Sequence, residues 1–181
     1  MTQRAKYMPG PASGATVEKN GEKWTLVLTR QLRHAPEKVW DALTDPAQLT
    51  AWAPFDADRS LATVGSVKLT TIGAPEAHAS CETVVERAEA PKHLEYSWGG
   101  QHLRWELEPL ASGTKLTLWH NIDRRYIAWG AAGWHICFDV LDHLLAHEPI
   151  GRLTGPEAMK LEGWQRLAKE YREQFAEGSE S

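Results

Sequence analysis

Cysteine, long apolar runs and an excess of basic residues are all scarce in this sequence, and each scarcity excludes a class of protein. The only two cysteines, Cys81 and Cys137, lack the spacing of a zinc site. No apolar run approaches the roughly 20 residues that a membrane-spanning helix needs, and residues 1–21 lack the apolar segment of a secretory signal. The net charge of −4 comes without a strongly basic patch, which argues against a nucleic-acid partner. We therefore expect a cytoplasmic protein with reduced cysteines and without a membrane or nucleic-acid partner.

Catalytic and cofactor motifs are missing as well. The sequence has no nucleophile elbow, no glycine loop that would cradle a phosphate and no dinucleotide fingerprint. Cys137 lies among apolar residues of a predicted helix, whereas a catalytic thiol needs a positive and partly exposed setting. We expect no cofactor and no resident metal, and a binding function before a catalytic one.

Tryptophan, by contrast, is abundant. Nine tryptophans in 181 residues are more than a core of this size requires. Because the indole ring is large and amphipathic, the excess favours a lined pocket or a contact surface.

The order of the predicted elements is strand, two short helices, a run of strands and a long late helix. Alternating apolar residues predict a first strand over Trp24–Leu32, and the prolines of PEKVWDALTDPAQLTAW, residues 36–52, begin and divide two short helices. Antiparallel strands follow over 61–122, then a helix over Gly133–His147 and an amphipathic helix over Glu157–Phe175. One sheet with helices gives an α+β domain. We predict a flexible arm over 1–21, the domain over 22–150, and an additional helix within 151–176 that packs on the domain or at a dimer contact; the final EGSES should fray.

Three segments carry a resemblance to a known family. Residues 36–52, TKLTLWHNI at 114–122 and GWHICFDVLDHLL at 133–145 resemble the family named after the C-terminal domain of the Hsp90 ATPase activator, in the START-like (SRPBCC) superfamily. The resemblance spans roughly residues 24–147 and implies the helix-grip, or Bet v1-like, fold: a curved antiparallel sheet wrapped around a long C-terminal helix, with two short helices after the first strand. Nothing here corresponds to the separate N-terminal domain of the eukaryotic activator, and the chain looks like bacterial members of the family.

The apolar strand faces and the long helix supply a candidate ligand site. The resemblance brings these faces together around a cavity, which would be lined by Trp52, Phe55, Tyr96, Trp98, Trp105, His120, Trp134, Phe138 and Leu141, with Trp52 and Phe55 near its mouth. The aromatic rings could leave an apolar cavity for a ligand or simply fill the core. His120, the one polar residue on its strand face, could hold a ligand, act as a general base, or be a core histidine with its hydrogen bonds satisfied.

Two groups of polar residues are further candidate sites. His135, Asp139, His143 and His147 recur every fourth residue, as metal ligands on a helix can. The helical wheel places them opposite Trp134, Phe138 and Leu141, so we expect a solvated face rather than a metal site. Asp123, Arg124 and Arg125 could meet an anionic head group or form a plain surface loop.

Three functions follow, in order of preference. The first is binding of a small hydrophobic molecule between sheet and helix. The second, implied by the resemblance, is an interaction module for an Hsp90-type chaperone. The third is a cyclase-like or hydrolytic enzyme that uses His120. The protein is expected to be a monomer or a homodimer.

Overall fold

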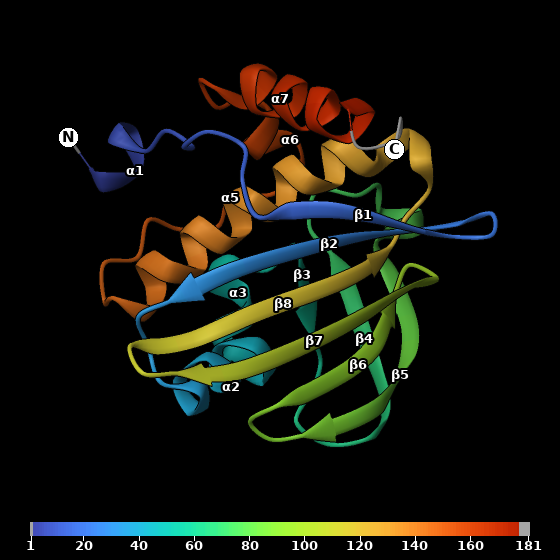
Figure 1. The fold of residues 1–181 in the computed structure, drawn as a ribbon. Coiled ribbons are helices and arrows are strands. Elements are labelled where there is room, and N and C mark those ends of the chain that lie inside the picture. Colours follow the sequence, from blue (N-terminus) through green and yellow to red (C-terminus); the bar gives the residue numbers. More distant parts are fainter. Residues whose placement is uncertain (1, 178–181) are drawn as a thin grey trace.

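The computed structural model describes residues 2–177, which excludes Met1 of the predicted arm and all but the first residue of the tail expected to fray. One antiparallel sheet has the strand order β1-β2-β8-β7-β6-β5-β4-β3 (Figure 1). Its strands are β1 (Ala15–Asn20), β2 (Lys23–Leu32), β3 (Phe55–Ala57), β4 (Gly65–Thr71), β5 (Ser80–Glu89), β6 (His93–Trp98), β7 (Gln101–Leu110) and β8 (Gly113–Asn121). The helices are α1 (Gln3–Lys6), α2 (Pro36–Thr44), α3 (Pro46–Trp52), α4 (Glu76–Ala79), the 3-10 turn η1 (Arg124–Tyr126), α5 (Ile127–Leu145), α6 (Gly155–Met159) and α7 (Trp164–Glu177).

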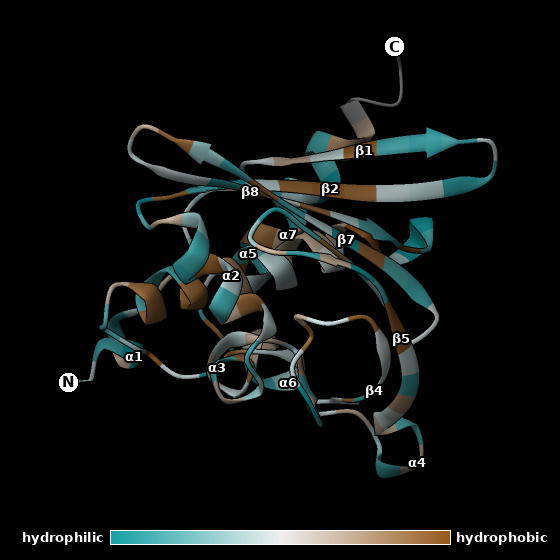
Figure 2. Cartoon of the chain, turned by 90° about the horizontal axis from the view of Figure 1, so that it is seen from below, coloured by the Kyte–Doolittle hydropathy of each residue, from teal (hydrophilic) through white to brown (hydrophobic). Residues whose placement is uncertain are grey.

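The sheet curls around the helices, as the view from below in Figure 2 shows. The core lies between the concave face of the sheet and the long helix α5. This arrangement confirms the predicted α+β helix-grip fold. Among the described residues, no helix combines the length and the apolar character needed to cross a membrane.

The two short helices begin where the prolines predicted. Pro36 and Pro46 each stand in the first turn of their helix, where a missing N–H costs no hydrogen bond. Asp45 caps α3, since its side chain accepts from the Ala47 N–H at 3.1 Å. The indole of Trp52 then donates to the carbonyl of Ala42 at 2.8 Å and ties α3 to α2. These two helices close one side of the grip.

Register places the predicted apolar faces on the concave side. His120 of β8 stands opposite Leu26 of β2 and Leu103 of β7. Leu118, the preceding residue on the same face of β8, stands opposite Leu28 and Trp105. All six side chains are buried, so the period-2 pattern identified this face correctly.

The N-terminal segment carries regular structure that the sequence analysis did not predict. Ala15–Asn20 forms β1, which pairs with β2 along its whole length at the edge of the sheet. Ahead of it, Gly14 has a φ of +71°, and a Cβ there would lie 2.5 Å from the carbonyl oxygen of Thr29. Only glycine fits that turn into the strand. The alternation in β1 is weak because its side chains are mostly exposed, which is why an irregular arm was expected.

The helical boundaries also differ from expectation. α5 begins at Ile127, six residues before the predicted start, and runs through Gly130 and Gly133. A Cβ at Gly130 would lie 2.8 Å from Cδ1 of Ile122, so this glycine lets α5 pack closely against that side chain. The final predicted helix is two helices, α6 and α7, separated by residues 160–163.

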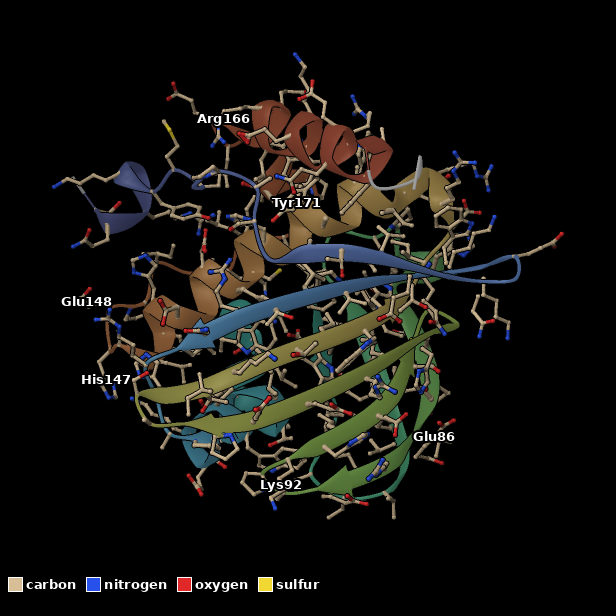
Figure 3. The ribbon with its side chains drawn as sticks, in the orientation of Figure 1. Glu86, Lys92, His147, Glu148, Arg166 and Tyr171 are labelled. Carbon is tan, nitrogen blue, oxygen red and sulfur yellow. The ribbon has the colours of Figure 1, made fainter. Side chains whose placement is uncertain are left out.

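The helix α7 and the N-terminal segment cover the face of α5 that points away from the sheet. Figure 3 shows Arg166 and Tyr171 on α7, and both contact that segment. Arg166 donates to the Pro9 carbonyl at 2.5 Å, and the Tyr171 hydroxyl donates to the Ser13 carbonyl at 2.9 Å. Both long faces of α5 are therefore packed against protein.

The prediction that the polar stripe of α5 faces solvent is wrong for its first two members. His135 is 4% exposed, and its Nδ1 lies 2.7 Å from the Tyr171 hydroxyl. Asp139 accepts from Arg30 at 2.5 Å and from the hydroxyl of Tyr7 at 2.5 Å. The helical wheel could not anticipate this because the covering elements lie at the two ends of the chain. Within residues 2–177, no three His, Cys, Asp or Glu side chains are grouped to hold a metal ion.

Candidate ligand-binding site

A pocket of about 300 Å³ opens where the first half of α5 meets the ends of β6, β7 and β8. The segment 154–164, which contains α6 and the start of α7, forms its other wall. The lining residues are Pro54, Trp98, Gln101, His120, Ile122, Tyr126, Trp129, Gly130, Gly133, Trp134, Cys137, Thr154, Gly155, Ala158, Met159 and Trp164. None of them carries a formal charge at neutral pH, so the pocket is suited to an uncharged molecule.

Three of the nine predicted residues line this pocket, namely Trp98, His120 and Trp134. The other six are at most 1% exposed and fill the core beneath it: Trp52, Phe55, Tyr96, Trp105, Phe138 and Leu141. The expectation that Trp52 and Phe55 stand at a mouth is wrong, because both side chains are fully enclosed. The filled-core alternative therefore describes the deep part of the grip, and the pocket lies at one end of it.

Aromatic packing separates the filled core from the pocket. Trp105 meets Trp52 edge to face at 6.1 Å between ring centroids, and meets Trp134 at 5.5 Å in the same manner. Trp134 in turn meets Trp98 at 6.0 Å. Such edge-to-face contacts hold the rings in fixed orientations. Trp98 and Trp134 therefore form a rigid floor between core and pocket.

His120 occupies a completely hydrogen-bonded position on this floor and is 2% exposed. The indole N–H of Trp134 donates to His120 Nδ1 at 3.0 Å. His120 Nε2 lies 2.7 Å from Oε1 of Gln101. Because an indole nitrogen can only donate, Nδ1 is the acceptor and Nε2 carries the proton. Of the alternatives left open for His120, the hydrogen-bonded core histidine is the one that this geometry favours.

Burial lowers the pKa of His120 to about 4, so the ring is neutral at neutral pH. A general base needs a free lone pair, but the lone pair of Nδ1 already accepts from Trp134. Proton abstraction by His120 would require this buried bond to break first.

Most of the pocket wall comes from residues that sequence reasoning missed. Gly130 and Gly133 lie three residues apart on α5 and line the pocket, so this part of the helix has no side chains there. That pair was a usable signal, because small residues at helical spacing leave room on one face. The contribution of 154–164 could not be found, since it depends on how the chain folds back after α5.

The rim of the pocket is apolar and exposed. Tyr126, Trp129 and Met159 have exposed fractions of 52%, 49% and 43%. They are three of the six large hydrophobic side chains that lie exposed within the described residues. Their concentration at one opening distinguishes this site from the rest of the surface.

The structure also places the two cysteines and the Asp123–Arg125 segment. Burial raises the pKa of the Cys137 thiol to about 12, so the thiol is unreactive although it lines the pocket. Cys81 is half-buried on β5. Arg125 is engaged by Asp123 at 3.0 Å beside the pocket and outside its lining.

The comparisons with known proteins agree with this fold. A family model for activator of Hsp90 ATPase homolog 1-like proteins matches residues 33–146. No curated protein matches the chain. The structure of a conserved protein of unknown function from Enterococcus faecalis is similar, with a TM-score of 0.67 and 16% identity over 88% of this chain and 89% of that one.

Two further solved structures are similar. CalU16 from Micromonospora echinospora has a TM-score of 0.61 and 20% identity, covering 90% of this chain and 92% of its own. Protein MLL2253 from Mesorhizobium loti has a TM-score of 0.58 and 26% identity, covering 68% of this chain and 97% of its own. The family model spans more than half of the sequence and includes α2, α3, the strands β3 to β8 and α5. The chain therefore belongs to the family of activator of Hsp90 ATPase homolog 1-like proteins.

Proposed function

We propose that the protein binds a small, uncharged and largely apolar molecule in the pocket above Trp98 and Trp134. The observation that carries this proposal is the pocket itself, an uncharged hollow of about 300 Å³ beside the buried apolar core. Pockets of this size with apolar walls and few polar groups are typical of small-molecule sites. The apolar rim supports the same function, because a bound ligand would remove part of Tyr126 and Trp129 from water.

The setting of this function is proposed to be the cytoplasm. Both cysteines are free, in keeping with a reducing compartment. General-base catalysis by His120 is not part of the proposal, since both ring nitrogens are engaged.

Gly133 offers a direct test. It lines the pocket, and a Cβ built on it meets no atom within 4 Å. Gly133→Ala should add about 0.5–1 kcal/mol of stability, because alanine favours the helix over glycine, and should leave most of the pocket open. Gly133→Leu gains the same backbone benefit but places its side chain in the pocket.

We expect the neutral fluorescent probe N-phenylnaphthylamine to bind the wild-type protein and Gly133→Ala, and to bind Gly133→Leu at least about 10-fold more weakly. Fluorescence titration measures the three affinities, with a thermal melt of each variant as the folding control. Equal affinity of folded Gly133→Leu and Gly133→Ala would remove the pocket as the binding site.

A second candidate function is stimulation of an Hsp90-type chaperone. The family description, matched over residues 33–146, is the observation that favours it. The test is the ATPase rate of a purified Hsp90-type chaperone with and without the protein, with Gly133→Leu in parallel. A rate that rises equally with both proteins supports a chaperone role independent of the pocket, whereas an unchanged rate excludes it.

A further inference from the structure

We infer that the ligand carries an uncharged hydrogen-bond acceptor, such as a carbonyl oxygen, which accepts from the side-chain amide N–H of Gln101. This inference rests on the proposed function and adds the chemical class of the ligand. It depends on a hydrogen-bonded series of three side chains, Trp134, His120 and Gln101. The donors and acceptors of this series can be arranged in only one way.

The hydrogen-bonded series begins at the indole of Trp134. Its N–H donates to His120 Nδ1 at 3.0 Å. Neutral imidazole has one donor and one acceptor, so His120 Nε2 must be the donor nitrogen. The group 2.7 Å from Nε2 must then be an acceptor, which assigns the oxygen of the Gln101 amide to that position.

The reversed arrangement fails. If the Gln101 amide were turned by 180°, its NH₂ group would face His120 Nε2, and the imidazole proton would have to move to Nδ1. Two N–H groups would then face one another across the 3.0 Å contact with Trp134. A buried donor left without an acceptor costs about 1–3 kcal/mol, so only one direction of donation along the three side chains is favourable.

The amide nitrogen of Gln101 is therefore left over at the pocket. Gln101 lines the pocket, and among the described residues the only hydrogen bond of its side chain is the one that its oxygen accepts from His120 Nε2. Gln101 follows the Gly99-Gly100 turn and shares the concave face with Leu103 and Trp105. The NH₂ group is thus a donor without a protein partner among the described residues, on a side chain that lines the pocket.

The other tryptophans of the lining agree with this polarity. Trp129 and Trp164 bring indole N–H groups that have no hydrogen-bond partner among the described residues, while the indole of Trp98 donates to Thr71 at 2.8 Å. The side-chain acceptors fixed by chemistry, the Gln101 oxygen and His120 Nδ1, are both occupied. A neutral ketone, quinone or ester fits such a lining, whereas a carboxylate or an amine would lack a charged partner.

A matched pair of ligands tests the inference. Acetylnaphthalene has a carbonyl oxygen where isopropenylnaphthalene has a methylene group of similar shape. Each is used to displace N-phenylnaphthylamine from the wild-type protein. We expect the ketone to bind roughly 2- to 10-fold more tightly, the effect of one net hydrogen bond.

Two substitutions assign this preference to Gln101. Gln101→Glu keeps an acceptor for His120 and removes the donor, while Gln101→Met removes both and introduces no charge. We expect each variant to bind the two ligands equally, with affinity for isopropenylnaphthalene within about 2-fold of wild type for Gln101→Met. Thermal melts establish that the variants are folded.

The outcomes separate the two proposals. Equal binding of ketone and alkene by the wild-type protein, with the probe still blocked by Gly133→Leu, overturns the inference and leaves the proposed function standing. A ketone preference that survives in both Gln101 variants overturns the assignment to Gln101. Failure of the wild-type protein to bind the probe contradicts the proposed function itself.

Discussion

His120 is neutral and held in one tautomer by two side chains from distant parts of the chain. Trp134 comes from α5 and Gln101 from the start of β7, so neither contact is local in sequence. Protonation would place a second N–H against the Trp134 indole and a charge in an apolar core. Burial, which penalises the charged form, lowers the pKa of His120 to about 4.

Stability should consequently depend on pH through His120. An unfolded histidine has a pKa of about 6.5. Between about 6.5 and about 4 the unfolded chain binds more protons than the folded one, so stability falls as the pH falls through this window. The whole difference corresponds to about 3 kcal/mol in the free energy of unfolding.

Urea unfolding of the wild-type protein and His120→Gln, at neutral pH and near pH 4, measures this contribution. We expect the stability difference between the two proteins to shrink by about 2–3 kcal/mol at the lower pH. His135, whose pKa burial also lowers, titrates in both proteins and cancels in the comparison. A difference that stays constant with pH would contradict a buried, neutral His120.

At the scale of elements, α5 is packed on two sides. Its inner face, with Trp134 and Phe138, was predicted correctly because apolar periodicity is a property of the helix alone. On its outer face, His135 and Asp139 were mispredicted because they meet partners from α7 and the N-terminal segment. A polar helix face predicts exposure to solvent only when no other element offers hydrogen-bonding partners for its side chains.

The turn at Gly14 should matter for the N-terminal segment that covers α5. Gly14→Ala forces a side chain into a φ of +71° and against the Thr29 carbonyl, so we expect a loss of about 2 kcal/mol or more. Gly10→Ala is the matched control, since a Cβ there meets nothing within 4 Å, and its effect should stay within about 0.5 kcal/mol. Urea unfolding measures both, and equal effects would show that the close approach at Gly14 is unimportant.

At the scale of the whole molecule, the sequence predicted the grip but not the position of its opening. Alternation on the strands and the paired prolines of 36–52 determine the sheet and the short helices, and these features are local. The pocket depends on where the aromatic rings stop filling the space, and so on Gly130, Gly133 and the return of 154–164 across the end of the sheet. Six predicted pocket residues proved to be enclosed in the core for this reason.

The measurement that tests the account most directly is the response of individual indole N–H resonances to N-phenylnaphthylamine, assigned by single Trp→Phe substitutions. The account predicts shifts for the pocket residues Trp98, Trp129, Trp134 and Trp164. The enclosed Trp52 should be unchanged, and so should Trp119, whose ring packs 3.9 Å from the Arg104 guanidinium. These shifts should disappear in Gly133→Leu. Shifts confined to Trp119, or pocket resonances that respond equally in Gly133→Leu, would contradict a ligand site at the open end of the grip.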